Sequence, residues 1–120
     1  MDSIKFKFIE ATWEADLYIS ETQALRYYFN LEMKQIRWLG HAGFKISFSD
    51  PVEKEQMRNI YIDTWLQNPL IPEDLKDGAV PDDADLVLVT HGHFDHSGSA
   101  PDLVKASKKP NCKVVCNFEI

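Results

Sequence analysis

Three of the four histidines in this 120-residue chain, His91, His93 and His96, fall within six residues, and Asp95 lies among them. Residues two apart in an extended segment point the same way, so His91 and His93 can reach one ion together. Asp95 and His96 follow the bend and can face a second, neighbouring point. Imidazole nitrogen and carboxylate oxygen are usual ligands of zinc. The stretch therefore predicts a divalent metal site, with Zn²⁺ first and Mn²⁺ or Fe²⁺ as alternatives.

The elements on either side of this stretch place it at the edge of a sheet. The continuous apolar run of residues 86–89 predicts a strand buried on both faces, which leads directly into the histidines. Loops at the carboxyl ends of strands are where open α/β sheets form their sites. After the stretch, Ser99 can cap a helix that has Pro101 in its first turn, and a last strand is expected at 112–116.

The residues upstream predict the rest of the sheet. Alternating or β-branched apolar residues predict strands at 34–39, 44–48 and 60–62, with a turn at 40–43. A β-hairpin followed by a β–loop–α–β unit indicates a mixed α/β (α+β) fold with helices outside the sheet. The connection between the third and fourth strands is rich in Pro, Asp and Gly, and its acidic residues are expected to be solvated turn residues: Asp82, Asp83 and Asp85.

Composition excludes some classes of protein. The net charge of −6 disfavours binding to nucleic acid, which needs clustered Lys and Arg. No run of eighteen apolar residues predicts a transmembrane helix, and the start lacks the apolar core of a signal peptide, so a cytoplasmic protein is expected. Cys112 and Cys116 flank a strand of about 13 Å, too long for a disulfide, and are expected to be free.

The histidine stretch resembles the HxHxDH signature of the metallo-β-lactamase superfamily. Residues 38–44, 62–69 and 84–90 further resemble small metal-dependent hydrolases related to ascorbate-6-phosphate lactonase and, more distantly, to N-acyl-phosphatidylethanolamine phospholipase D. Thr64 stands where that subgroup has proline. The resemblance covers about 33–120 and implies a partial metallo-β-lactamase domain there, the N-terminal half of a four-layer αββα sandwich. Residues 1–32 are then an N-terminal extension, with a strand at 4–8 and a helix over about 21–31.

The resemblance implies a role for each candidate residue. His91 and His93 bind a first metal and Asp95 and His96 a second, so two zinc ions are expected. Asp95 also has the expected catalytic role of orienting the attacking water or accepting its proton. Two further residues are expected beside the cleft, each with an equally good structural explanation. Asp63 could be a turn former, and the other, His41, a hydrogen-bonded turn histidine.

The implied activity is hydrolysis of a small ester, lactone or phosphodiester by a metal-activated water. The superfamily's remaining ligands, a later His, an acidic residue and a final His, have no counterpart because no histidine follows His96. The alternative is therefore a non-catalytic metal-binding or interaction fragment that needs an oligomeric partner or a missing C-terminal half. An oxygen- or NO-reducing di-iron protein is disfavoured, because those proteins resemble HxExDH and the third position here is His93.

Overall fold

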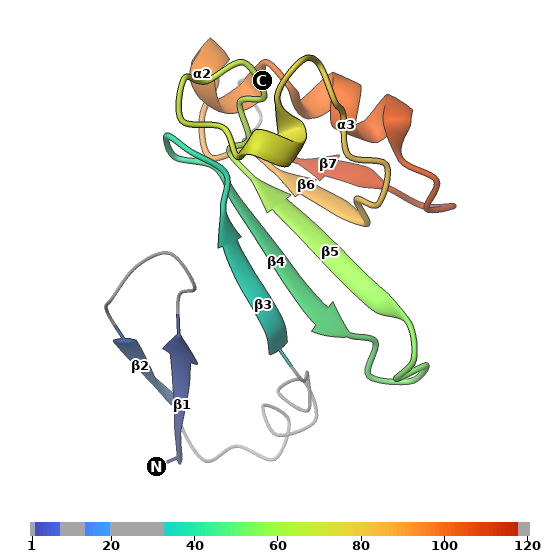
Figure 1. Ribbon diagram of the computed structural model, residues 1–120. Helices are drawn as coiled ribbons and strands as arrows, with labels where there is room; N and C mark the ends of the chain where they lie inside the picture. Colours follow the sequence, from blue (N-terminus) through green and yellow to red (C-terminus); the bar gives the residue numbers. More distant parts are fainter. Residues whose placement is uncertain (1, 8–13, 20–32, 118–120) are drawn as a thin grey trace.

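The computed structural model describes residues 2–7, 14–19 and 33–117. Its main feature is a mixed five-stranded sheet in the order β3-β4-β5-β6-β7 (Figure 1). β3 to β5 are antiparallel, whereas β6 runs parallel to β5 and β7 parallel to β6. The mixed α/β class is thereby confirmed. The strands are β3 (Met33–Trp38), β4 (Phe44–Ser49), β5 (Met57–Ile62), β6 (Leu86–Leu88) and β7 (Lys113–Val115).

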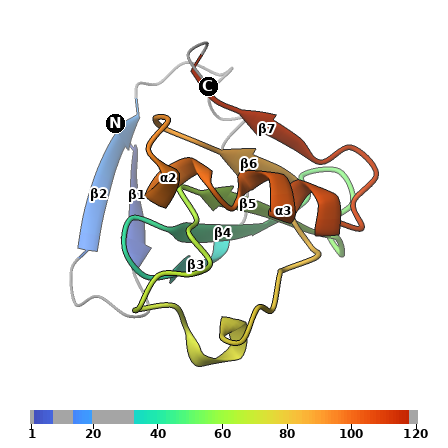
Figure 2. The ribbon, with the colours of Figure 1, turned by 90° about the horizontal axis from the view of Figure 1, so that it is seen from above.

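Within residues 33–117, three short helices accompany the sheet: a 3-10 helix η1 (Glu73–Leu75), α2 (Phe94–Ser97) and α3 (Ala100–Ala106). α3 contacts β6 and β7, and Figure 2 shows α2 and α3 following each other along one side of the sheet. α3 confirms the predicted helix, but the prediction that the Ser99 side chain caps it is wrong. Ser99 precedes α3, yet its hydroxyl makes no capping bond and instead accepts the Leu66 N–H at 3.0 Å.

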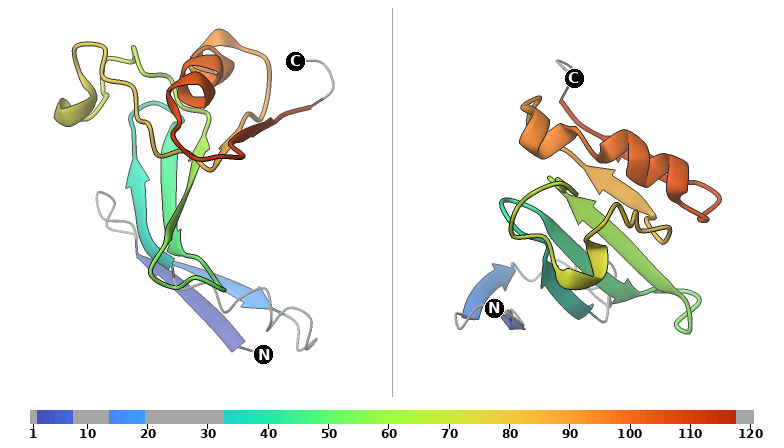
Figure 3. Two further views of the ribbon diagram at one scale, coloured as in Figure 1. Left: turned by 90° about the vertical axis from the view of Figure 1, so that its right-hand side faces the viewer. Right: turned by 45° about the horizontal axis from the view of Figure 1, so that its top comes forward.

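The two faces of the sheet are buried to different extents. On one face, Tyr61 and Val87 are 1% exposed and pack in the core with Leu39, Val89 and Leu103. On the other face the side chains are only half-buried, so the prediction that residues 86–89 are buried on both faces is wrong. Pairing places these apolar residues on that second face: Phe44, Ile46, Phe48, Ile60, Ile62, Leu86 and Leu88. Figure 3 shows α2, α3 and the loop 64–83 gathered around one end of the sheet.

The acidic cluster before β6 is held by the sheet, so the prediction of solvated turn residues is wrong for two of its three members. Asp83 accepts hydrogen bonds from the Lys45 ammonium and the Tyr61 hydroxyl, both at 2.6 Å. Burial tends to raise the pKa of Asp83, but these two donors outweigh it and lower the pKa. Asp85 accepts a bond from Arg58 at 2.9 Å. These contacts fix the entry into β6 and hence the strand that leads to the histidines.

The N-terminal region contains a described hairpin, β1 (Asp2–Lys7) paired antiparallel with β2 (Glu14–Ile19). The predicted first strand overlaps β1, whereas β2 was not predicted. The predicted helix over about 21–31 lies outside the described residues, and the division at residues 32 and 33 stays a prediction. Both cysteines, Cys112 and Cys116, are free, as predicted. In the described ranges, no helix has the length and apolar character needed to cross a membrane.

Candidate metal centre

The candidate residues meet because β5 and β6 are adjacent and parallel. Ile62 at the end of β5 pairs with Leu88 at the end of β6, so the segments that follow the two strands leave the same edge of the sheet. The Asp63 N–H donates to the Leu88 carbonyl at 3.0 Å, which continues this pairing by one residue. Asp63 and the loop that starts at Thr90 are thereby brought together, as expected for a site at the carboxyl ends of strands.

Asp63 ties the end of β5 to the histidine loop. It is 5% exposed and has a left-handed backbone with φ 42°. One carboxylate oxygen accepts the Thr90 N–H at 2.8 Å and the other accepts the Thr90 hydroxyl at 2.5 Å. Burial tends to raise the pKa of Asp63, but the Thr90 hydrogen bonds and the nearby His96 outweigh it, so the pKa is lowered. Asp63 is a turn residue by its backbone, and its side chain also organises the loop.

His91 and His93 lie side by side at the start of that loop. His91 Nε2 is 3.2 Å from His93 Nδ1, and the ring centroids are 4.7 Å apart. Two ligands of a tetrahedral zinc ion with bonds of 2.0–2.1 Å are separated by about 3.3 Å. The spacing of the two nitrogens therefore fits a shared ion. The Thr90 hydroxyl lies 3.0 Å from His91 Nδ1, the ring nitrogen on the other side.

α2 places the last two residues of the motif. His93 is its N-cap residue, and Asp95 and His96 lie in the single turn that follows. The centroids of the His96 and His91 rings are 4.0 Å apart. Its Nδ1 is 3.1 Å from Asp63 Oδ2 without hydrogen-bond geometry, so this buried nitrogen has no hydrogen-bond partner within the described part of the chain. A buried imidazole nitrogen without a partner is costly; a cation at Nδ1 would satisfy it, as would a proton on Nδ1 directed at Asp63 when Nε2 binds metal.

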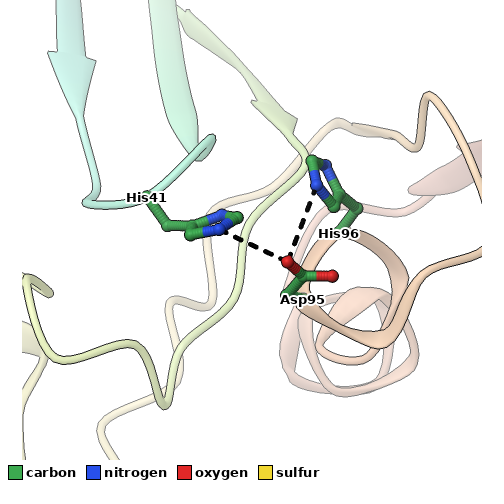
Figure 4. A group of neighbouring side chains, drawn as sticks. All are labelled: His41, Asp95 and His96. Atoms are coloured by element: carbon green, nitrogen blue, oxygen red, sulfur yellow. Dashed lines mark ion pairs between the residues drawn. The ribbon is translucent and has the colours of Figure 1, made fainter.

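His41 joins the cluster from the turn between β3 and β4. Its Nε2 lies 3.3 Å from Asp95 Oδ2, and Figure 4 shows the His41 and His96 rings directed at that one oxygen. His96 Nε2 is 3.8 Å from the same atom. His41 is thus both a turn histidine, with φ 50°, and a neighbour of the motif. The turn position predicted for His41 is confirmed, and its functional role stays a prediction.

Among the residues that the structure describes, two sets of three side chains each present ligand atoms within 4.8 Å of one another. One set is His41, Asp95 and His96, and the other is Asp63, His91 and His96. These are nitrogen and oxygen donors without sulfur, a set that suits Zn²⁺ and also Mn²⁺ or Fe²⁺. The residues present therefore fit a divalent cation by donor type and spacing, and His96 supplies an unpaired nitrogen to one of the two sets.

Asn68 also shapes the site, and the sequence analysis did not identify it. It is 2% exposed, its amide donates to the Leu39 carbonyl at 3.0 Å, and its oxygen accepts the Leu70 N–H at 2.9 Å. It thus joins the loop after β5 to the turn that carries His41. Gly40 is required beside it, because a Cβ there would lie 2.2 Å from Asn68 Oδ1, with φ at 84°. In the sequence, the only signal for Asn68 was its place in the 62–69 stretch.

Comparison with known proteins agrees with this geometry. Residues 62–115 match the metallo-β-lactamase superfamily. The chain is 39% identical over 77 residues to a UPF0173 metal-dependent hydrolase of Hyperthermus butylicus, covering 64% of this chain and 30% of that protein. It is 38% identical over 88 residues to one of Pyrobaculum aerophilum, covering 72% of this chain and 33% of that protein. It is 36% identical over 86 residues to one of Anaeromyxobacter dehalogenans, covering 72% of this chain and 28% of that protein. No solved structure matches the chain.

These matches and the sheet define a partial metallo-β-lactamase fold, and the chain resembles that superfamily over residues 62–115. The chain is similar to UPF0173 metal-dependent hydrolases, and it spans about 30% of the length of the relatives it matches. Similarity to metal-dependent hydrolases implies a divalent metal. The resemblance predicted from the histidine stretch is thereby confirmed at the level of the family.

Proposed function

We propose that the protein is a hydrolase in which two zinc ions activate a water for attack on an ester, lactone or phosphodiester. The observation that carries the proposal is the crowding of three imidazoles and two carboxylates at the end of β5 and β6. His91 Nε2 and His93 Nδ1 are 3.2 Å apart, a spacing that suits one zinc ion. Mn²⁺ or Fe²⁺ would suit the same donors.

His91 and His93 would hold the first metal, and Asp95 and His96 the second. When bound, such metals lower the pKa of a water toward neutrality and polarise the oxygen that is attacked. With metal bound, Asp95 would orient the attacking water or accept its proton; its carboxylate lies beside the His41 and His96 rings. Asp63 holds Thr90 through two hydrogen bonds and so fixes the start of the loop that presents His91.

The test is metal-dependent turnover by the purified full-length chain. Metal is removed by chelation and returned as Zn²⁺ or Mn²⁺, and three chromogenic probes are compared: a carboxylic ester, a lactone and a phosphodiester. Activity should require metal, and His93→Ala should abolish it. Asp77→Asn is the matched control, because Asp77 lies in the loop 64–83 and in neither candidate metal set. Turnover that survives both chelation and His93→Ala would contradict the proposal.

A second candidate is a non-catalytic metal-binding fragment that needs a partner to complete its fold. One observation favours it. One face of the sheet carries apolar side chains that are only half-buried, including Ile60, Ile62, Leu86 and Leu88. Metal binding without turnover, together with self-association or capture of a polypeptide that restores activity, would favour this candidate over the first.

A further inference from the structure

We propose that His41 is a metal ligand, which with Asp95 and His96 forms a three-ligand site built by this chain alone. The inference rests on the proposed function, because it assumes that Asp95 and His96 bind metal. It goes beyond that proposal by adding a ligand from outside the histidine stretch, on the turn between β3 and β4. Nothing in the spacing of residues 91–96 indicates this residue.

The distances are those of ligands around one ion. His41 Nε2 and Asp95 Oδ2 are 3.3 Å apart, the separation of about 3.3 Å expected for two ligands of tetrahedral zinc. His96 Nε2 lies 3.8 Å from the same oxygen, so its ring needs a shift of only about half an ångström to reach that separation. All three ligand atoms lie within 4.8 Å of one another. They therefore enclose a position that one cation can occupy.

The turn holds His41 in place from several directions. Its backbone is left-handed with φ 50°, a conformation that non-glycine residues adopt at a cost of about 1–2 kcal/mol. Trp38 Nε1 donates to the His41 carbonyl at 2.9 Å, and the Gly43 N–H donates to the Gly40 carbonyl at 2.9 Å. The edge of the ring meets Trp65 with centroids 5.6 Å apart. The imidazole is therefore fixed toward Asp95 before any ion binds.

The competing explanation is that His41 only donates a hydrogen bond to a carboxylate that binds metal. In that arrangement His41 would normally meet the oxygen that faces away from the metal. Instead, His41 and His96 are directed at the same Asp95 oxygen, as Figure 4 shows. Three protein ligands with a fourth position left for water is also the usual arrangement of a catalytic zinc. The partial exposure of His41, 39% of its side chain, leaves room for that water.

Side-chain NMR tests the inference without relying on activity. The full-length chain is labelled with ¹⁵N-histidine, and long-range ¹H–¹⁵N correlations are recorded while Zn²⁺ is added to the metal-free protein. His41→Asn assigns the His41 signals, and asparagine tolerates the left-handed backbone. The His41 Nε2 resonance should move to the position of a metal-bound nitrogen, together with those of His91, His93 and His96.

Affinity provides the second readout. Loss of a residue that only supports a ligand typically weakens metal binding 10–100-fold, so loss of a ligand should weaken it by more than about 100-fold. His41→Asn is therefore expected to weaken the second of two Zn²⁺ binding steps by more than that. Asp77→Asn is the control for a change at a left-handed position, φ 61°, in neither candidate metal set, and it should bind Zn²⁺ like the parent.

The outcomes separate this inference from the proposed function. If Zn²⁺ shifts His91, His93 and His96 but leaves His41 Nε2 unchanged, His41 is not a ligand and the proposed function stands. If no histidine responds to Zn²⁺ in a chain whose other signals show a folded protein, both fail. A response of His41 with a loss of affinity within 100-fold for His41→Asn assigns it a supporting role and overturns the inference.

Discussion

Replacement of Asp63 by asparagine should weaken metal binding and folding together. Asparagine keeps the left-handed backbone and the shape of the side chain, but it replaces one acceptor oxygen by an NH₂ group. The Thr90 hydroxyl bond at 2.5 Å is then lost or reversed, and a hydrogen bond to a charged group is worth about 1.5–3 kcal/mol. The NH₂ group also meets His96 Nδ1, now 3.1 Å from the carboxylate, and favours the tautomer that protonates Nε2.

His96 Nε2 is the nitrogen that faces Asp95, and it cannot bind metal while it carries a proton. Because Asp63 acts through His96, Asp63→Asn should lower zinc affinity 10–100-fold, about 1.4–2.8 kcal/mol. Calorimetric titration measures the affinity, and urea unfolding of the metal-free chain measures the stability. Asp77→Asn, the same change at another left-handed aspartate, should alter neither. If Asp63→Asn changes zinc affinity and unfolding stability no more than Asp77→Asn does, the reasoning is refuted.

Three further predictions concern the frame around the site. Gly40→Ala should destabilise the chain by more than about 2 kcal/mol in urea unfolding, because its Cβ would meet Asn68 at 2.2 Å and its φ is 84°. Tyr61→Phe should cost about 1.5–3 kcal/mol, since it removes the hydrogen bond to a carboxylate at 2.6 Å; an unchanged unfolding midpoint would contradict this. Hydrogen bonds from the Glu53 N–H and from Arg58 lower the pKa of Asp50 to about 2. Because the folded pKa is depressed, this stabilisation is present above pH 4 and lost toward pH 2, so the stability gap between the parent and Asp50→Asn should close over that window.

The sheet could be predicted from local patterns because each strand carries its own signal. The alternation at 44–48 predicts β4, and the apolar run at 86–89 predicts β6. The candidate metal site could be proposed from sequence for the same reason, since its four motif residues are neighbours in sequence. The burial of residues 86–89 on both faces was wrongly predicted, because the run itself does not show what covers each face.

The contacts that were missed join residues far apart in sequence. Asn68, which was not predicted, contacts Leu39 across 29 residues, and Asp63, which was predicted beside the cleft, contacts Thr90 across 27. Asp83 was wrongly predicted to be a solvated turn residue because its partner Lys45 lies 38 residues earlier. Such pairings arise only when the strands assemble into the sheet, and no local pattern encodes them. The short helix α2 was missed because four residues give no helical periodicity.

Anomalous diffraction at the zinc absorption edge tests the central claim most directly. Crystals of the full-length chain, grown with Zn²⁺, would be measured on both sides of the edge. The account predicts anomalous peaks within coordination distance of His91, His93, Asp95 and His96. An ordered loop with no peak there, in crystals that contain zinc at saturating concentration, would contradict it.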